Sequence, residues 1–257
     1  MPIFVGTSGW QYQHWRGRYY PRQLAPARWL EHYAADFATV ELNASFYRLP
    51  PRATFESWAA RTPPDFVFAV KLSRYLTHIR RLKEPREPIE RFMEAASGLG
   101  ARLGPVLVQL PPSFELDTAA LDATLEAFPS GTRVAVEPRH ASWFVDEVRA
   151  VLERHGAALC LADRRGPVTP LWRTADWTYL RFHEGLGRPQ PCYRREEIMA
   201  WARRFAGDWP PEADRFAYFN NDPAGCAVRD AAIAGLVFAE VGLASSRTPP
   251  PEAAPVG

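Results

Sequence analysis

Eight short apolar runs, separated by segments with helical periodicity, constrain the fold of this chain most strongly. The runs are hydrophobic at nearly every position, which is typical of parallel strands buried on both faces. We expect strands at residues 2–6, 38–43, 66–71, 105–110, 133–138, 157–162, 177–183 and 215–220. Helical segments are expected at residues 27–36, 52–61, 87–99, 117–127, 142–155, 194–206 and 226–241.

This strand–helix alternation predicts an α/β fold, a single TIM-type (β/α)8 barrel over residues 1–243. A chain of 257 residues suits one such barrel. The segment between Asp163 and Trp177 contains Pro167 and Pro170 and has no helical period, so the sixth helix should be weak or missing. A doubly wound open sheet is the alternative. Residues 244–257 are rich in proline and are expected to form a disordered tail.

Composition excludes several classes of protein. The formal net charge of +2 provides no overall field for a nucleic-acid backbone. No apolar run is long enough to span a membrane, and the first residues lack a secretory signal pattern. Cys160, Cys192 and Cys226 are far apart and lack CxxC spacing. We therefore expect three free thiols and a cytoplasmic protein without membrane contact.

Polar residues follow almost every expected strand. Because the carboxyl ends of barrel strands meet at one mouth, these residues predict a single chemical site there. They are Lys71, Gln109, Glu137, Arg139, His140, Asp163, Arg181, His183, Asn220 and Asn221. Glu41 and Asn43 alternate on the second strand and should point to the same side.

Seven segments carry a family resemblance. They are GTSGWQYQHWRGRYYP (6–21), TVELNASFYRLP (39–50), FVFAVKLSRYLTHIRRL (66–82), LGPVLVQLPPSF (103–114), VAVEPRHASW (134–143), TADWTYLRFH (174–183) and YFNNDPAGCAVRDA (218–231). Together they resemble the YecE-like family, domain of unknown function 72, across nearly the whole chain. The resemblance implies a TIM barrel and candidate residues, but no reaction. Departures from the family pattern are Pro138, NAS after Glu41, Glu184 and Asp230.

The residue types at the mouth favour acid/base chemistry. Glu41 and Glu137 are candidate general acid/base groups, and Lys71 and His183 complete the candidate catalytic set. Lys71 is the expected partner of Glu41, and a purely structural ion pair inside the barrel is the alternative. The expected substrate-binding residues are Trp10, which would stack on the substrate, and Asn43, Gln109, Arg139, His140, Asp163, Arg181, Asn220 and Asn221.

These patterns predict a hydrolase or lyase acting on a small anionic substrate, phosphorylated or nucleotide-like, without an organic cofactor. The P-loop, Rossmann and GxSxG patterns are absent from the sequence. One alternative is a divalent-metal nuclease or sugar isomerase that uses carboxylate and histidine ligands. Another is a non-catalytic module that binds a nucleotide or nucleic acid, with the basic loop 77–83 as a weak contact. The oligomeric state is not indicated.

Overall fold

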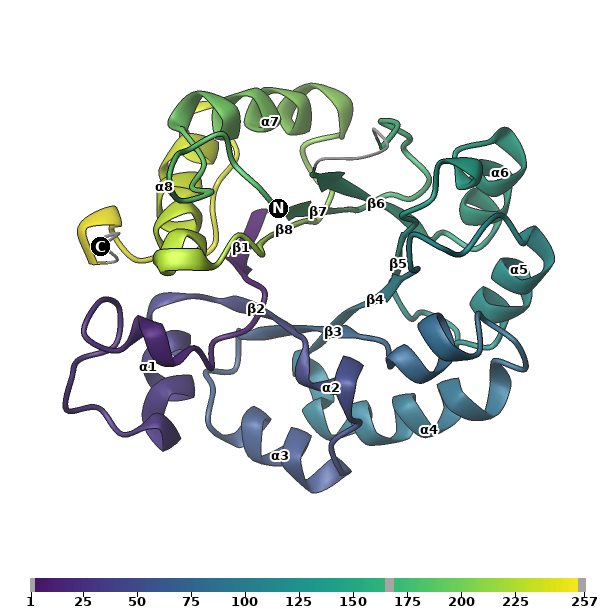
Figure 1. Ribbon diagram of the computed structural model, residues 1–257, viewed down its shortest axis with the longest axis horizontal. Coiled ribbons are helices and arrows are strands. Elements are labelled where there is room, and N and C mark those ends of the chain that lie inside the picture. Colours follow the sequence, from purple (N-terminus) through teal and green to yellow (C-terminus); the bar gives the residue numbers. More distant parts are fainter. Residues whose placement is uncertain (1–2, 165–168, 254–257) are drawn as a thin grey trace.

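The computed structural model, which describes residues 3–164 and 169–253, is a barrel of eight parallel strands (Figure 1). Hydrogen bonds join the strands in the order β1-β8-β7-β6-β5-β4-β3-β2. The predicted (β/α)8 barrel is therefore confirmed, and the open-sheet alternative is wrong. The strands are β1 Ile3–Thr7, β2 Thr39–Leu42, β3 Val67–Lys71, β4 Leu103–Gln109, β5 Val134–Glu137, β6 Ala158–Asp163, β7 Thr178–Phe182 and β8 Arg215–Phe219.

The helices surround the strands, as Figure 1 shows. They are α1 Trp29–Asp36, α2 Ala44–Tyr47, α3 Arg52–Ala60, α4 Arg86–Ala96, α5 Thr118–Glu126, α6 Asp146–Arg154, α7 Arg195–Asp208 and α8 Cys226–Glu240. Each helical segment expected from the sequence overlaps one of them, and the short α2 is an addition. Between β6 and β7 the described residues, 164 and 169–177, form no helix, as expected, whereas Pro167 lies outside the described residues.

Strands β1 and β2 approach closely but share no ladder, so this seam is closed by other groups. The amide of Thr7 donates to the hydroxyl of Tyr33 at 3.0 Å, and that hydroxyl donates to the carbonyl of Thr39 at 3.1 Å. A Cβ atom at Gly6 would lie 2.4 Å from the Thr39 oxygen, so only glycine permits this approach. One tyrosine side chain thus links the end of β1 to the start of β2.

The C-terminal segment closes the lower half of the same seam. The Ile3 amide donates to Ala244 and the Ser246 amide donates to Ile3, both at 2.8 Å. The amide of Ala38 donates to the carbonyl of Arg247 at 3.3 Å, which connects the segment to the start of β2. Residues 244–247 therefore lie along this seam, unlike the disordered tail expected for residues 244–257 from their composition, and residues 254–257 lie outside the described residues.

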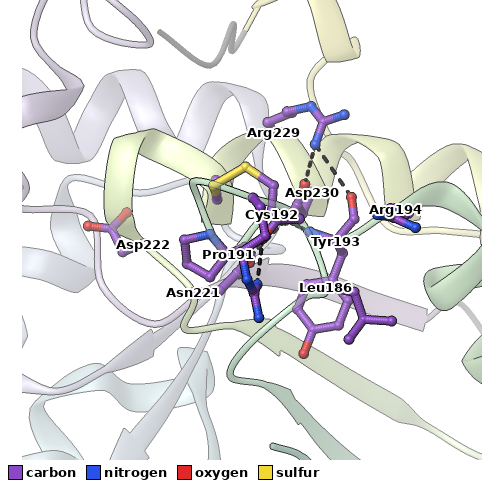
Figure 2. The surroundings of a disulfide bond; sticks show 12 residues. Leu186, Pro191, Cys192, Tyr193, Arg194, Asn221, Asp222, Arg229 and Asp230 are labelled. Carbon is purple, nitrogen blue, oxygen red and sulfur yellow. Dashed lines mark hydrogen bonds and ion pairs between the residues drawn. A yellow bond between two sulfur atoms is a disulfide. The ribbon is translucent and has the colours of Figure 1, made fainter.

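Two of the three cysteines form a disulfide, which corrects the expectation of free thiols. Cys192, in the β7–α7 loop, bonds to Cys226, the first residue of α8, and Cys160 stays a buried thiol (Figure 2). The two cysteines are 34 positions apart, and the barrel brings them together because β7 and β8 are neighbours. Within the described residues, no helix has the length and apolar character needed to cross a membrane.

The barrel interior changes from apolar to charged along its axis. Side chains that alternate along the strands fill the lower and middle interior, among them Ala69, Leu107, Ala135, Cys160 and Phe216. The next inward positions toward the carboxyl ends are polar and almost fully buried; they are Glu41, Lys71, Gln109, Glu137 and Arg181. The polar layer predicted from the strand ends is therefore a real layer of the barrel.

Candidate active site

Arg181 holds two buried glutamates from opposite edges of its guanidinium group. Its Nε and Nη2 atoms donate to the two carboxylate oxygens of Glu41 at 2.9 and 2.8 Å. Its Nη1 atom donates to Oε2 of Glu137 at 2.7 Å. Each of the three side chains is at most 1% exposed, so both ion pairs are shielded from water. Arg181 thereby joins strands β2, β5 and β7 across the top of the barrel.

Both carboxylates are held in the ionised form. The hydroxyl of Tyr179 donates to Glu41 at 2.7 Å, and the amide of Gln109 donates to Glu137 at the same distance. Burial alone would raise the pKa of each glutamate, but the Arg181 charge, together with hydrogen bonds and other nearby charges, more than offsets it. The pKa of Glu41 is lowered, and that of Glu137 is held well below its usual value.

His183 is fixed as a neutral imidazole beside Glu137. Its Nε2 atom lies 3.2 Å from Oε1 of Glu137, and its Nδ1 atom lies 3.1 Å from the amide nitrogen of Asn220. Because the Asn220 amide donates, the ring hydrogen belongs on Nε2, facing the carboxylate. Burial and the nearby Arg181 charge lower the pKa of His183. The ring is therefore uncharged at neutral pH.

Lys71 differs from the other charged groups of this layer. Its ammonium lies 4.0 Å from the centre of the Phe46 ring and forms no ion pair or hydrogen bond with any side chain among the described residues. Burial, and then repulsion from Arg181, lowers its pKa from 10.5 to about 8. The expected Glu41–Lys71 ion pair is not formed, because Arg181 reaches across from β7 and occupies both oxygens of Glu41.

A pocket of about 370 Å³ opens next to His183, at the mouth of the barrel. Arg139 lies at its edge and donates from Nε to Glu137 at 3.1 Å, with 28% of its side chain exposed. Arg164 also lines the pocket, and its buried Nε atom has no hydrogen-bond partner in the described part of the chain. Glu184 also lines this pocket, so the mouth carries three carboxylates (Glu41, Glu137 and Glu184) and four cations (Lys71, Arg139, Arg164 and Arg181), a small excess of positive charge.

Several residues expected at the site have other contacts. Asp163 points outward and accepts a hydrogen bond from the Trp201 indole at 3.0 Å. His140 bonds through Nδ1 to the hydroxyl of Ser142, 2.8 Å away, within its own turn. Trp10 is buried and packs edge-on against Trp58, with ring centres 5.6 Å apart.

Asn221 has a structural contact as well as a place at the pocket. Its amide nitrogen donates to Asp230 at 2.7 Å and to the Pro191 carbonyl at 3.0 Å, next to the disulfide (Figure 2). Asp230 also accepts from the amide of Tyr193 at 2.7 Å. The β7–α7 loop that borders the pocket beside His183 is therefore tied to α8 by both the disulfide and this buried carboxylate.

The structure adds four residues that sequence reasoning missed. Tyr179 lies two positions before Arg181, so strand alternation alone places it on the same face. Arg164 directly follows the expected Asp163. Phe46 and His78 pack edge to face beside Lys71, with ring centres 4.9 Å apart, and no local sequence signal indicates this contact.

A family model for a protein of unknown function, DUF72, matches residues 4–252. The chain belongs to the DUF72 family. The resemblance identified from the sequence motifs is therefore confirmed. Among curated DUF72 relatives, UPF0759 protein YunF of Bacillus subtilis is 26% identical, covering 87% of this chain and 90% of YunF. UPF0759 protein YecE of Escherichia coli is also 26% identical, covering 79% of this chain and 81% of YecE.

Solved DUF72 structures share the fold. A DUF72 protein from Thermotoga maritima is 30% identical, with a TM-score of 0.78 over 93% of this chain and 98% of that protein. SacUVDE is similar in fold alone, with a TM-score of 0.58 and 10% identity over 94% of this chain and 99% of that structure. Neither likeness supplies a substrate for the DUF72 barrel.

Proposed function

We propose that this DUF72 protein is an enzyme, a hydrolase or lyase, that binds a small phosphorylated or nucleotide-like anion at the barrel mouth. The observation that carries the proposal is two incompletely bonded cationic groups at the barrel mouth, Lys71 at the end of β3 and Arg164 at the pocket beside His183. Among the described residues, Lys71 bonds no carboxylate, and the buried Nε atom of Arg164 meets no acceptor. A phosphate oxygen is the acceptor that such groups favour.

The same contacts assign different roles to the charged residues. Glu41 and Glu137, expected to exchange protons, are each held by several donors with a lowered pKa, so they position Arg181 and His183. Lys71 has a pKa of about 8 and titrates near neutral pH, which suits a general acid or base. Arg139 and Arg164 would hold the anion.

A metal-dependent nuclease or isomerase is less well supported. Within the described residues, no three His, Cys, Asp or Glu side chains cluster as a metal site. Arg181 also lies between the two glutamates, where it would repel a cation. A cytoplasmic location stays a prediction, and the Cys192–Cys226 disulfide is unusual for a reducing compartment.

Phosphate binding tests the proposal directly. We expect inorganic phosphate, followed by calorimetry or phosphorus NMR, to bind the wild-type protein at pH 7. Lys71→Met should weaken this binding by about 10-fold or more, since a charged hydrogen bond contributes about 1.5–3 kcal/mol. Lys83→Met, in the basic loop outside the pocket, is the matched control. Equal affinities in the two variants would exclude Lys71 as the anion ligand.

Turnover separates an enzyme from a binding module. A panel of phosphate monoesters and nucleotides, incubated with wild-type protein, should yield a product that phosphorus NMR detects. Lys71→Met should abolish that product, whereas Lys83→Met should not. Tight binding across the panel without any product would favour the non-catalytic alternative.

A further inference from the structure

A second pocket lies at the same mouth, between the segments that follow β1 and β2. Its volume is about 200 Å³. It is lined by Gly9, Trp10, Gln11, Tyr12, Leu42, Asn43, Ala44 and Tyr47. These residues follow strand ends directly, so the pocket opens at the same end of the barrel as the cationic pocket beside His183.

The walls of this second pocket are aromatic and held in place. Trp10 is 3% exposed and is fixed by its edge-on contact with Trp58. The hydroxyl of Tyr12 donates to the Ser8 carbonyl at 2.5 Å. Tyr47, in contrast, is 72% exposed although it lines the pocket. An aromatic face open to water beside a rigid aromatic wall suits a planar ring.

Asn43 gives the pocket a directional polar group. Its Oδ1 atom is buried and has no hydrogen-bond partner in the described part of the chain. Asn43 itself lines the pocket, and its side-chain amide can offer a donor and an acceptor together to the edge of a heterocycle. The pocket therefore favours a planar ring with polar edge groups over a purely apolar ring.

Helix α2 connects this pocket to the anion site. Phe46 packs under the Lys71 ammonium, and its neighbour Tyr47 lines the aromatic pocket. Asn43 stands two residues beyond Glu41, about 7 Å further along the chain direction. One molecule with an anionic group at Lys71 and a ring at Tyr47 would contact both faces of α2.

We propose that the aromatic pocket is the nucleobase subsite of a nucleoside phosphate whose phosphate binds at Lys71. This inference rests on the proposed function, which supplies the phosphate group of the ligand. It adds that the rest of the ligand is a nucleoside. The base would stack on Tyr47, and Trp10 would form the inner wall of the subsite. The polar edge of the base would bond to Asn43.

The test compares four ribonucleoside 5′-monophosphates with ribose 5-phosphate and inorganic phosphate by calorimetry. At least one nucleotide should bind about 10-fold or more tightly than ribose 5-phosphate, because stacking on an aromatic side chain contributes that much. Tyr47→Ala should remove this gain and leave inorganic phosphate affinity unchanged. Tyr75→Ala, an exposed tyrosine outside the pocket, is the control and should keep the gain.

Asn43→Ala provides a second variant and should reduce the preference for one base over the others. If nucleotides bind no better than ribose 5-phosphate while phosphate binding still depends on Lys71, the nucleobase subsite is wrong and the anion site stands. If Lys71→Met leaves phosphate binding unchanged, the proposed function fails as well. A Tyr47→Ala variant that loses phosphate and nucleotide affinity equally would also overturn the inference.

Discussion

Arg181 is the residue on which the charge arrangement of the mouth depends. It bonds two buried glutamates that come from different strands, and Lys71 bonds neither. The sequence places all four side chains in one layer, because each lies at an inward position near a strand end. It does not reveal which cation meets which carboxylate, because that depends on side-chain reach across the barrel.

Replacing Arg181 by lysine should destabilise the protein although the charge is kept. A lysine ammonium cannot bond both glutamates in the geometry of the guanidinium fork, and breaking a buried ion pair costs about 3–5 kcal/mol. Urea unfolding of Arg181→Lys should show a loss of this size. Arg139→Lys, which removes a half-exposed bond to Glu137, should lose less than about 1 kcal/mol. Similar losses of unfolding free energy in the two variants would contradict the role of Arg181 in holding both glutamates.

The charge of Lys71 should set the pH dependence of phosphate binding. Its ammonium is present below its pKa of about 8, so affinity should fall as the pH rises through that value. Lys71→Arg, which stays charged, should remove the fall. Calorimetry from pH 6.5 to 9.5 measures both variants, and a fall near pH 8 that persists in Lys71→Arg would assign the titration to another group.

The same pKa shift has the opposite sign for stability. Burial lowers the pKa of Lys71 in the folded state, so the unfolded chain binds more protons between pH 8 and its usual value of 10.5. The contribution of Lys71 to the free energy of unfolding should therefore increase with pH across this window. Urea unfolding of wild type and Lys71→Met at several pH values should show the difference between them growing in that direction.

At the scale of helices and strands, periodicity predicted more than local capping signals did. Asp117 caps α5 as expected, through a 2.9 Å bond from the Ala120 amide. Ser142 was expected to begin a helix, but α6 begins at Asp146 and the Ser142 hydroxyl accepts from Leu116. Asp222 lies just before the short helical turn Pro223–Gly225, but its carboxylate accepts from the Trp15 indole at 2.7 Å and caps no backbone amide. Whether such a side chain caps a helix or bonds elsewhere depends on its tertiary contacts, and these cannot be read from the local sequence.

Strand alternation could have corrected one site residue. Cys160 lies in the inner cluster of the barrel, so Asp163, three positions later, must face outward toward α7. Asp163 was nevertheless expected at the mouth because it ends an apolar run. The end of an apolar run shows where a residue lies along the barrel axis. Whether its side chain points inward or outward follows from the alternation of side chains along the strand.

The disulfide should stabilise the β7–α7 loop beside the pocket at His183. It closes a segment of 34 positions, and a loop of that length corresponds to about 2–4 kcal/mol of unfolding free energy. We expect dithiothreitol to lower the thermal midpoint of wild-type protein and to weaken phosphate binding. The Cys192→Ala/Cys226→Ala variant should show the lower midpoint already and no further response. A response of that variant to dithiothreitol would indicate another cause.

At the scale of the whole molecule, the sequence predicted the barrel. Eight parallel strands that are buried on both faces and separated by helices have few other arrangements. It did not predict how the barrel closes. Gly6, Tyr33 and the C-terminal segment close the β1–β2 seam through contacts between distant parts of the chain. The composition of the C-terminal segment predicts disorder because it is rich in proline and poor in large apolar side chains. The segment is ordered by backbone hydrogen bonds to Ile3 and Ala38, and composition carries no information about such bonds.

The seam makes the last described residues part of the folding unit. A chain ending at Leu243 would lose the backbone bonds that Ala244, Ser246 and Arg247 make with Ile3 and Ala38, worth about 3 kcal/mol together at about 1 kcal/mol each. Urea unfolding should show that loss, and hydrogen exchange should become faster in β1 and β2 while β5 and β6 stay protected. A chain ending at Ala253 is the matched control and should behave like the full chain. Since Glu41 lies on β2, the shorter chain should also bind phosphate more weakly; unchanged exchange in β1 would show that Tyr33 alone holds the seam.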